Sequence, residues 1–100
     1  MEYKNKNFFF ALLIFIGLIS CTYAEMSLEE KVGQLLMVHF QGEEANQEAN
    51  LLIQELHVGG IIYYNWSNGL SSAPQIRNLS TGLQKLATIP LLIAVDQEGG

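Results

Sequence analysis

Cysteine, histidine and charged residues are all scarce in this 100-residue sequence. The single cysteine, Cys21, excludes an internal disulfide. The two histidines, His39 and His57, stand in no Cys-x-x-Cys or His-Glu-x-x-His spacing, so we expect no metal site. Charged residues make up 15% of the chain and hydrophobic residues 49%, which is too apolar for a disordered chain. This length and composition predict at most one small folded domain.

The most apolar segment, Phe8–Ile19, is too short to cross a membrane. As a helix it would measure about 18 Å, against a hydrocarbon core of roughly 30 Å. Lys4 and Lys6 precede it and small, polar residues follow, which is the three-part layout of an export signal. We therefore expect residues 1–20 to be a signal peptide.

Two cleavage points are open at the end of this segment. Leu18-Ile19-Ser20-Cys21 resembles a bacterial lipobox, which would leave Cys21 to carry a lipid, and this is the preferred interpretation. Thr22-Tyr23-Ala24 also fits ordinary signal peptidase, which would remove residues 1–24. Either cut predicts an exported protein: a periplasmic or cell-envelope lipoprotein, or a secreted protein. Contact with a membrane is expected only through a lipid on Cys21.

The chain that remains after residue 20 is acidic. It has three basic and nine acidic residues, a formal charge of −6. No basic patch is left, and this argues against nucleic acid or an anionic membrane surface as a partner.

From Ser27 onward, helical and strand periodicities alternate. Ser27 with Glu30, and Ser72 with Gln75, are capping-box pairs that predict helix starts. Helices are expected from Ser27, from Asn46 to about Leu56, and from Ser72; strands are expected over 35–40, 61–64 and 91–95; a loop is expected over 65–72. Strands joined by amphipathic helices predict an α/β fold with a parallel sheet. A Rossmann-type sheet and a (β/α)₈ barrel both begin in this way, but no G-x-G-x-x-G opens either connecting helix.

Three segments resemble, in order and spacing, glycoside hydrolase family 3. They are SLEEKVGQLLMVHFQG (27–42), LHVGGIIYYN (56–65) and IPLLIAVDQEGG (89–100), and they are similar to the start of the catalytic domain in the bacterial β-N-acetylglucosaminidase branch. The resemblance covers essentially all of residues 25–100. It implies that these residues form the first three βα units of a (β/α)₈ TIM barrel, as a partial N-terminal domain.

The resemblance also implies an activity. Family members hydrolyse terminal β-linked sugars with retention, using an aspartate nucleophile and a separate acid/base group. Both groups are expected beyond Gly100, so no catalytic residue is assigned within the chain, which alone is expected to be inactive. The implied substrate carries terminal β-linked N-acetylglucosamine, and no cofactor or metal is implied.

Asp96 and Glu98 stand just after the third expected strand. Residues i and i+2 of a strand share a face, so the two carboxylates could resemble the pair of a retaining glycosidase. The following Gly99 and Gly100 indicate that the strand has already broken into a turn. The resemblance assigns Asp96 instead to binding sugar hydroxyls, and we expect Glu98 to hold the loop behind it.

The remaining aromatic and imidazole side chains belong to His39, His57 and residues 63–66. His39 stands where family members often have glycine, and as a lone histidine it is expected to be a core residue. His57 is expected to be structural at a helix end. Tyr63, Tyr64, Asn65 and Trp66 follow the second strand, and either a carbohydrate contact or plain barrel packing fits them.

Three alternatives to the exported β-N-acetylhexosaminidase stay open. The chain could belong to a β-glucosidase-type member of the family, because the residues that choose the sugar lie elsewhere. It could also be a non-catalytic exported sugar-binding module, or a truncated product.

Overall fold

The computed structural model of this chain contains three parallel strands with helices between them. The residues that it describes are 7, 10–13 and 25–98. Cys21, both expected cleavage points, Gly99 and Gly100 lie outside these residues. Within the described part of the chain, no helix has the length and hydropathy needed to span a bilayer.

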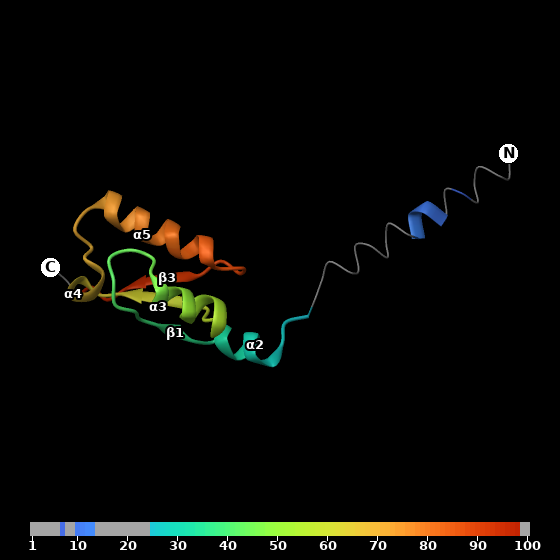
Figure 1. The fold of residues 1–100 in the computed structure, drawn as a ribbon, viewed down its shortest axis with the longest axis horizontal. Coiled ribbons are helices and arrows are strands. Elements are labelled where there is room, and N and C mark those ends of the chain that lie inside the picture. The colour runs from blue at the N-terminus through green and yellow to red at the C-terminus, as the bar shows by residue number, and fades with distance from the viewer. Residues whose placement is uncertain (1–6, 8–9, 14–24, 99–100) are drawn as a thin grey trace.

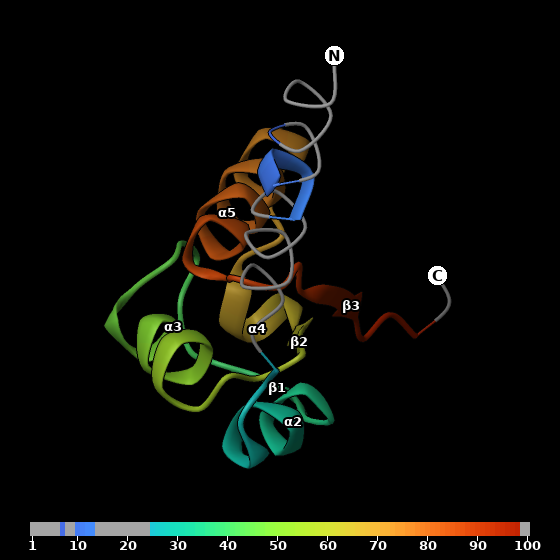
Figure 2. The same cartoon turned by 90° about the vertical axis from the view of Figure 1, so that its right-hand side faces the viewer.

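The strands are β1 (Met37–Val38), β2 (Gly60–Tyr63) and β3 (Leu92–Val95), and their order in the sheet is β1-β2-β3. Both neighbouring pairs are parallel, as the sequence predicts. The connections contain the helices, and Figure 2 shows α3 (Gln47–Asn50) and α5 (Ala73–Leu86) on the same side of the sheet. The class of fold is therefore α/β with a parallel sheet.

The first strand is shorter than the expected 35–40. At its start, Leu35 caps helix α2 (Leu28–Gln34), and the Leu36 N–H donates to the Gly33 carbonyl at 3.0 Å, so the chain is still turning. At its end, the Phe40 carbonyl accepts hydrogen bonds from side chains that follow β2 instead of continuing the ladder. Only Met37 and Val38 are left to pair with β2.

Capping residues place the helix starts well. Ser27 and Glu30 form the complete reciprocal capping box. Ser72 accepts from the Gln75 N–H, but the Gln75 side chain accepts from the Ser71 N–H, one residue before the expected donor. The second box is therefore only half right.

The second helix changes pitch along its length. α3 passes into the π-helical turn η1 (Leu51–Glu55), where the Leu56 N–H donates five residues back to the Leu51 carbonyl at 3.1 Å. Ala49, Ile53 and Leu56 recur at the spacing of one helical face, but Ala49 and Ile53 are buried, whereas Leu56 is exposed. The wider turn explains this difference, because it rotates the residues after Ile53 away from the expected stripe.

The expected loop over 65–72 is wrong at its start. Residues Asn65–Asn68 form a short helix, α4, in which the Tyr64 carbonyl accepts from the Asn68 N–H at 2.7 Å. Gly69 ends the turn with a φ of 77°, a left-handed conformation that favours glycine.

The core lies between the sheet and its covering helices. Its buried members come from β2, the helices α3, η1 and α5, and the segments after β1, before β2 and before β3: Phe40, Ala49, Ile53, Val58, Ile61, Tyr63, Leu79, Leu83 and Leu91. The opposite side of the sheet, here called the open face, carries Met37, Ile62, Leu92 and Ala94 by strand alternation and register. No helix among residues 25–98 covers the open face (Figure 2).

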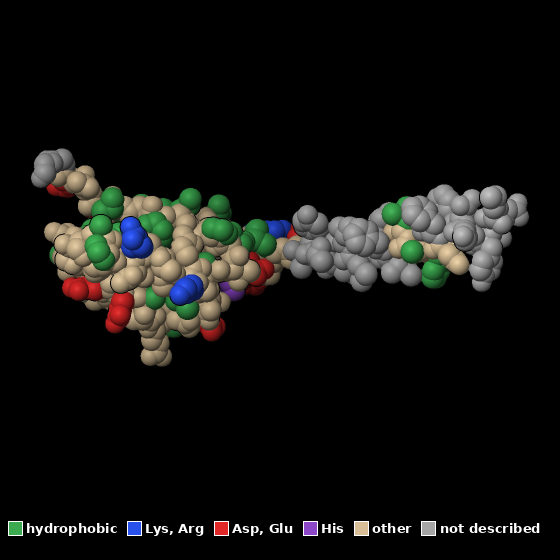
Figure 3. All heavy atoms as spheres, turned by 90° about the horizontal axis from the view of Figure 1, so that it is seen from above, with side chains coloured by type: hydrophobic (Ala, Val, Ile, Leu, Met, Phe, Trp, Pro, Cys, Tyr) green, Lys and Arg blue, Asp and Glu red, His purple; other side chains and the backbone are tan. Residues whose placement is uncertain are grey.

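Helix α2 makes its main contact through a glycine. The apolar stripe Leu28, Val32, Leu35 and Leu36 is exposed, and Leu35 is 85% accessible. A Cβ on Gly33 would collide with the backbone carbonyls of Leu56 and His57, and one on Gly59 with that of Gln34. The two backbones are thus in direct contact, and hydrophobic side chains stay at the surface here as elsewhere (Figure 3).

Candidate functional site

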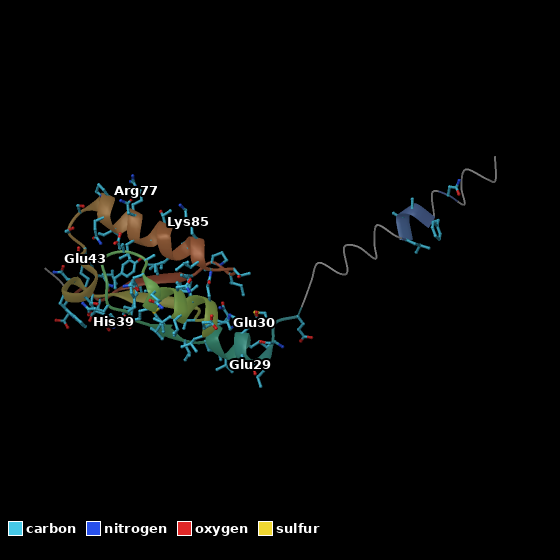
Figure 4. All side chains as sticks on the ribbon, viewed as in Figure 1. Glu29, Glu30, His39, Glu43, Arg77 and Lys85 are labelled. Atoms are coloured by element: carbon cyan, nitrogen blue, oxygen red, sulfur yellow. The ribbon has the colours of Figure 1, made fainter. Side chains whose placement is uncertain are left out.

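The carboxyl ends of the three strands meet at one edge of the sheet. His39 follows β1, Tyr64 follows β2 and Asp96 follows β3. In Figure 1 the strand arrows of β2 and β3 point toward α4, and in Figure 4 the labelled His39 lies at that same end. In parallel α/β folds this is the edge at which ligands bind.

Asp96 lies where the sequence predicts, one residue past β3. Its N–H donates to the Tyr63 carbonyl at 3.0 Å, so the pairing with β2 continues one step beyond the strand. The register then sets Asp96 opposite Tyr64, whose backbone is also extended. Adjacent strands stand about 4.8 Å apart, so these two side chains leave the same face as neighbours. The Asp96 carboxylate is exposed and available to donors from a ligand.

Glu98 does not form a strand-like pair with Asp96. Residues 96–98 lie outside β3, so strand geometry no longer fixes them on a common face. The strand has therefore ended before Glu98, while the turn expected at the glycines lies outside the described residues. The roles given to Asp96 and Glu98 by the family resemblance stay predictions.

A pocket of about 590 Å³ runs along the outer edge of β3. Its polar end is formed by Asp96, Gln97 and Glu98, and its apolar part by residues that include Leu70 and Ile76. Another pocket, of about 490 Å³, is lined by residues that include Glu30, His57 and Ile89 and lies at the opposite end of the strands. Because the carboxyl ends of parallel strands carry the chemistry in such folds, we place the candidate site at the first pocket's end of the sheet.

Two polar side chains of α4 join the loops after β1 and β2. Asn68 is fully buried; its amide nitrogen donates to the carbonyls of Phe40 and Gly42, and its Oδ1 accepts from the Tyr64 N–H at 2.9 Å. Ser67, also buried, donates to the Phe40 carbonyl or to Gln41 Oε1. Sequence reasoning missed both residues, since nothing in Asn-Trp-Ser-Asn predicts burial, and they fix the position of the loops that bear His39 and Tyr64.

His39 is not the core residue that the sequence predicts. It is half-buried, and its Nε2 lies 2.7 Å from Ser67 Oγ. Strand alternation explains the difference, because residue 39 faces the open side while Val38 and Phe40 face the helices.

His39, Tyr64 and Trp66 form a group that we call the aromatic cluster. Ring centroids are 5.3 Å apart for His39 and Tyr64, 5.1 Å for His39 and Trp66, and 5.3 Å for Tyr64 and Trp66. The neighbouring Tyr63 points the other way into the core, where its hydroxyl lies 2.8 Å from Ser80 Oγ. Of the two uses that the sequence left open, core packing is correct for Tyr63.

Burial raises the pKa of the Tyr63 phenol, and the hydrogen bond to Ser80 acts in the opposite direction.

His57 ends its helix as expected, with a φ of 55°, and its carbonyl accepts from Gln34 Nε2 at 2.8 Å. Among residues 25–98 no three His, Cys, Asp or Glu side chains gather in a way that could hold a metal ion.

A parallel α/β sheet with an acid just past its third strand occurs in several families of enzymes, so the fold alone does not identify the family. The family model for the glycosyl hydrolase family 3 N terminal domain matches residues 27–100. The chain belongs to glycoside hydrolase family 3.

Relatives agree with this assignment. A β-hexosaminidase of Photobacterium profundum is 45% identical over 65 residues, which cover 65% of this chain and 19% of that protein. A β-N-acetylglucosaminidase/β-glucosidase of Cellulomonas fimi is 34% identical over 85 residues, which cover 85% of this chain and 14% of that protein. The chain thus spans about a fifth or less of the length of these relatives.

A solved structure extends the likeness to the fold. The family 3 β-N-acetylglucosaminidase from Paenibacillus sp. str. FPU-7 superposes with a TM-score of 0.70 at 48% identity, over 76% of this chain and 15% of that one. This chain and the Paenibacillus enzyme are therefore similar both in sequence and in backbone structure over the matched residues.

Proposed function

We propose that residues 25–100 supply the first three βα units of a (β/α)₈ barrel in an exported β-N-acetylhexosaminidase. The observation that carries the proposal is the position of Asp96, one residue past β3 at the carboxyl edge of the sheet. In this position an ionised carboxylate accepts hydrogen bonds from sugar hydroxyls, while the nucleophile and the acid/base group belong to other parts of the barrel. The substrate would carry a terminal β-linked N-acetylglucosamine.

The relatives support this choice of sugar. The Photobacterium protein is named a β-hexosaminidase, and the Paenibacillus structure is that of a β-N-acetylglucosaminidase. The Cellulomonas protein carries both β-N-acetylglucosaminidase and β-glucosidase in its name, which favours a glucoside as the second candidate substrate. Export through residues 1–20, with a lipid on Cys21, belongs to the same proposal and rests on the sequence pattern.

The test is an exchange of residues 27–98 into the Paenibacillus enzyme in place of its matching segment. We expect the chimera to hydrolyse 4-nitrophenyl N-acetyl-β-glucosaminide faster than the matching glucoside. Asp96→Asn should lower kcat/KM by about tenfold to a hundredfold, since a hydrogen bond to a charged group contributes about 1.5–3 kcal/mol.

The matched control is Glu29→Gln, the same acid-to-amide change on an exposed residue of α2 at the far end of the domain (Figure 4). It should leave kcat/KM unchanged. An Asp96→Asn chimera as active as the unsubstituted one would reject the role given to Asp96.

A further inference from the structure

The aromatic cluster is unusual because it is ordered but not buried. Trp66 is 72% exposed, although its ring lies within 5.3 Å of both His39 and Tyr64. Packing within residues 25–98 covers little of this ring, whereas an aromatic ring that packs in a core has most of its apolar area removed from water. Exposed aromatic rings in a fixed arrangement are instead typical of a ligand surface.

The cluster is held from behind by buried polar groups. Ser67 Oγ lies 2.7 Å from His39 Nε2, and Asn68 accepts from the Tyr64 N–H with its Oδ1 and donates to the Phe40 carbonyl with its amide nitrogen. Both supports are at most 3% exposed and belong to the same short helix as Trp66. The rings are therefore positioned before any ligand arrives, which lowers the entropic cost of binding.

The surroundings indicate the chemical class of the ligand. The Asp96 N–H donates to the Tyr63 carbonyl, one residue before Tyr64, so an exposed carboxylate stands at the same edge of the sheet as the rings. The chain after residue 20 has a formal charge of −6, which disfavours an anionic ligand such as a nucleotide. A pyranose with equatorial hydroxyls fits both groups: its C–H faces are apolar and flat, and its hydroxyls donate to a carboxylate.

We propose that His39, Tyr64 and Trp66 form a stacking surface for a pyranose ring of a neutral carbohydrate, next to the hydroxyls that Asp96 would hold. This deepens the proposed function and rests on it for the identity of the sugar. The pyranose ring stacks on the side chains of Trp66 and Tyr64, and His39, which follows β1, contacts both of these aromatic side chains.

The chain offers a direct probe, because Trp66 is its single tryptophan. Titrating the full 100-residue chain with N,N′-diacetylchitobiose should shift and quench the Trp66 emission in a saturable way. Tyr64→Ala and His39→Ala should each raise Kd by about threefold to tenfold, which corresponds to the strength of one aromatic contact. Calorimetry with Trp66→Leu, whose exposed ring is not needed for folding, should give a Kd raised by at least the same factor.

Two controls keep the result specific. Leu35→Ala changes another exposed apolar residue, at the end of α2, and should leave Kd unchanged. Sorbitol at the same concentration has the hydroxyls but no ring, and should leave the emission unchanged. Circular dichroism of each variant confirms that it is folded.

The two proposals can fail separately. An unchanged Trp66 emission, or a linear drift that sorbitol reproduces, would overturn the stacking surface even if the chimera described above is active. A saturable shift that Tyr64→Ala weakens would support the stacking surface even if the Asp96→Asn chimera keeps its full activity.

Discussion

The phenol of Tyr63 couples the stability of the domain to pH. It is buried beside Ser80, and its pKa is raised above the ordinary value of 10.0. The neutral phenol is therefore the form that the fold favours. This contribution is fully present below pH 10 and is lost as the pH rises through the higher pKa of the folded state.

We expect the free energy of unfolding to fall more steeply above about pH 10 in the wild type than in Tyr63→Phe. At pH 8 the substitution should cost about 1 kcal/mol, because it removes the hydrogen bond to Ser80. Urea unfolding at pH 8, 10 and 11 measures both effects. Equal alkaline slopes in the two proteins would show that another group is responsible.

At the scale of single residues, the sequence predicts where a residue lies along its strand better than it predicts which side chains contact that residue. Asp96 lies one step past its strand because the pattern of LLIAV and the acid that follows it are local features. The environment of His39 could not be predicted in this way, because its partners Ser67 and Trp66 are about 28 residues away in a segment that was expected to be a loop.

Among the elements, the contact between α2 and the start of β2 is the most constrained. The Gly59 N–H donates to the carbonyls of Gly33 and Leu36, both at 3.0 Å. Gln34 Nε2 also donates to the His57 carbonyl. At Gly59 the main chain lies directly against the main chain of Gln34, so no side chain stands between them that could move aside.

Gly59→Ala should destabilise the domain by about 3 kcal/mol, because the added methyl collides with the backbone of Gln34. Thermal unfolding with circular dichroism detection measures the loss. Thr81→Ala, an exposed change on α5, should stay within about 0.5 kcal/mol of the wild type. A Gly59→Ala protein with an unchanged Tm would mean that this contact yields easily.

Element boundaries were predictable where capping or periodicity is local. Ser27 and Ser72 mark the starts of α2 and α5, and the 3-4-3 spacing of Ile76, Leu79, Leu83 and Leu86 gives the inner stripe of α5. The π-helical turn and α4 were missed. Both depend on which carbonyl an N–H finally reaches, and tertiary contacts decide that choice.

At the scale of the whole sheet, protection from hydrogen exchange should be uneven. β2 pairs on both sides, whereas β3 pairs only with β2 among residues 25–98. The N–H groups of Leu92 and Asp96 donate to Gly59 and Tyr63. By strand alternation, the N–H groups of Ile93 and Val95 point away from β2.

We therefore expect the amides of Ile93 and Val95 to exchange at least about tenfold faster than those of Leu92 and Asp96. Exchange followed by NMR on the full chain resolves these positions. Equal protection of all four amides would mean that the outer edge of β3 is paired in solution, for example with a second copy of the chain.

The whole fold was largely predictable, and the candidate site only in part. Alternating strand and helix patterns predict the parallel sheet, and the motifs ending in VDQEGG predict the family. The aromatic cluster needs two segments, around His39 and around residues 64–66, to be brought together, and the pattern of a single sequence does not show that they meet. The exposed stripe of α2 was likewise not predictable, because periodicity describes a helix face without identifying what covers it.

The contact between Gly33 and Gly59 also has a consequence for how the protein is made. All of its hydrogen bonds join residues within 33–60, so it needs nothing that is synthesised later. On the ribosome it can form once Gly60 has left the exit tunnel, before β3 has been translated. The offset between the first two strands would then be set during synthesis, and every later strand would be added to an edge whose register is already determined.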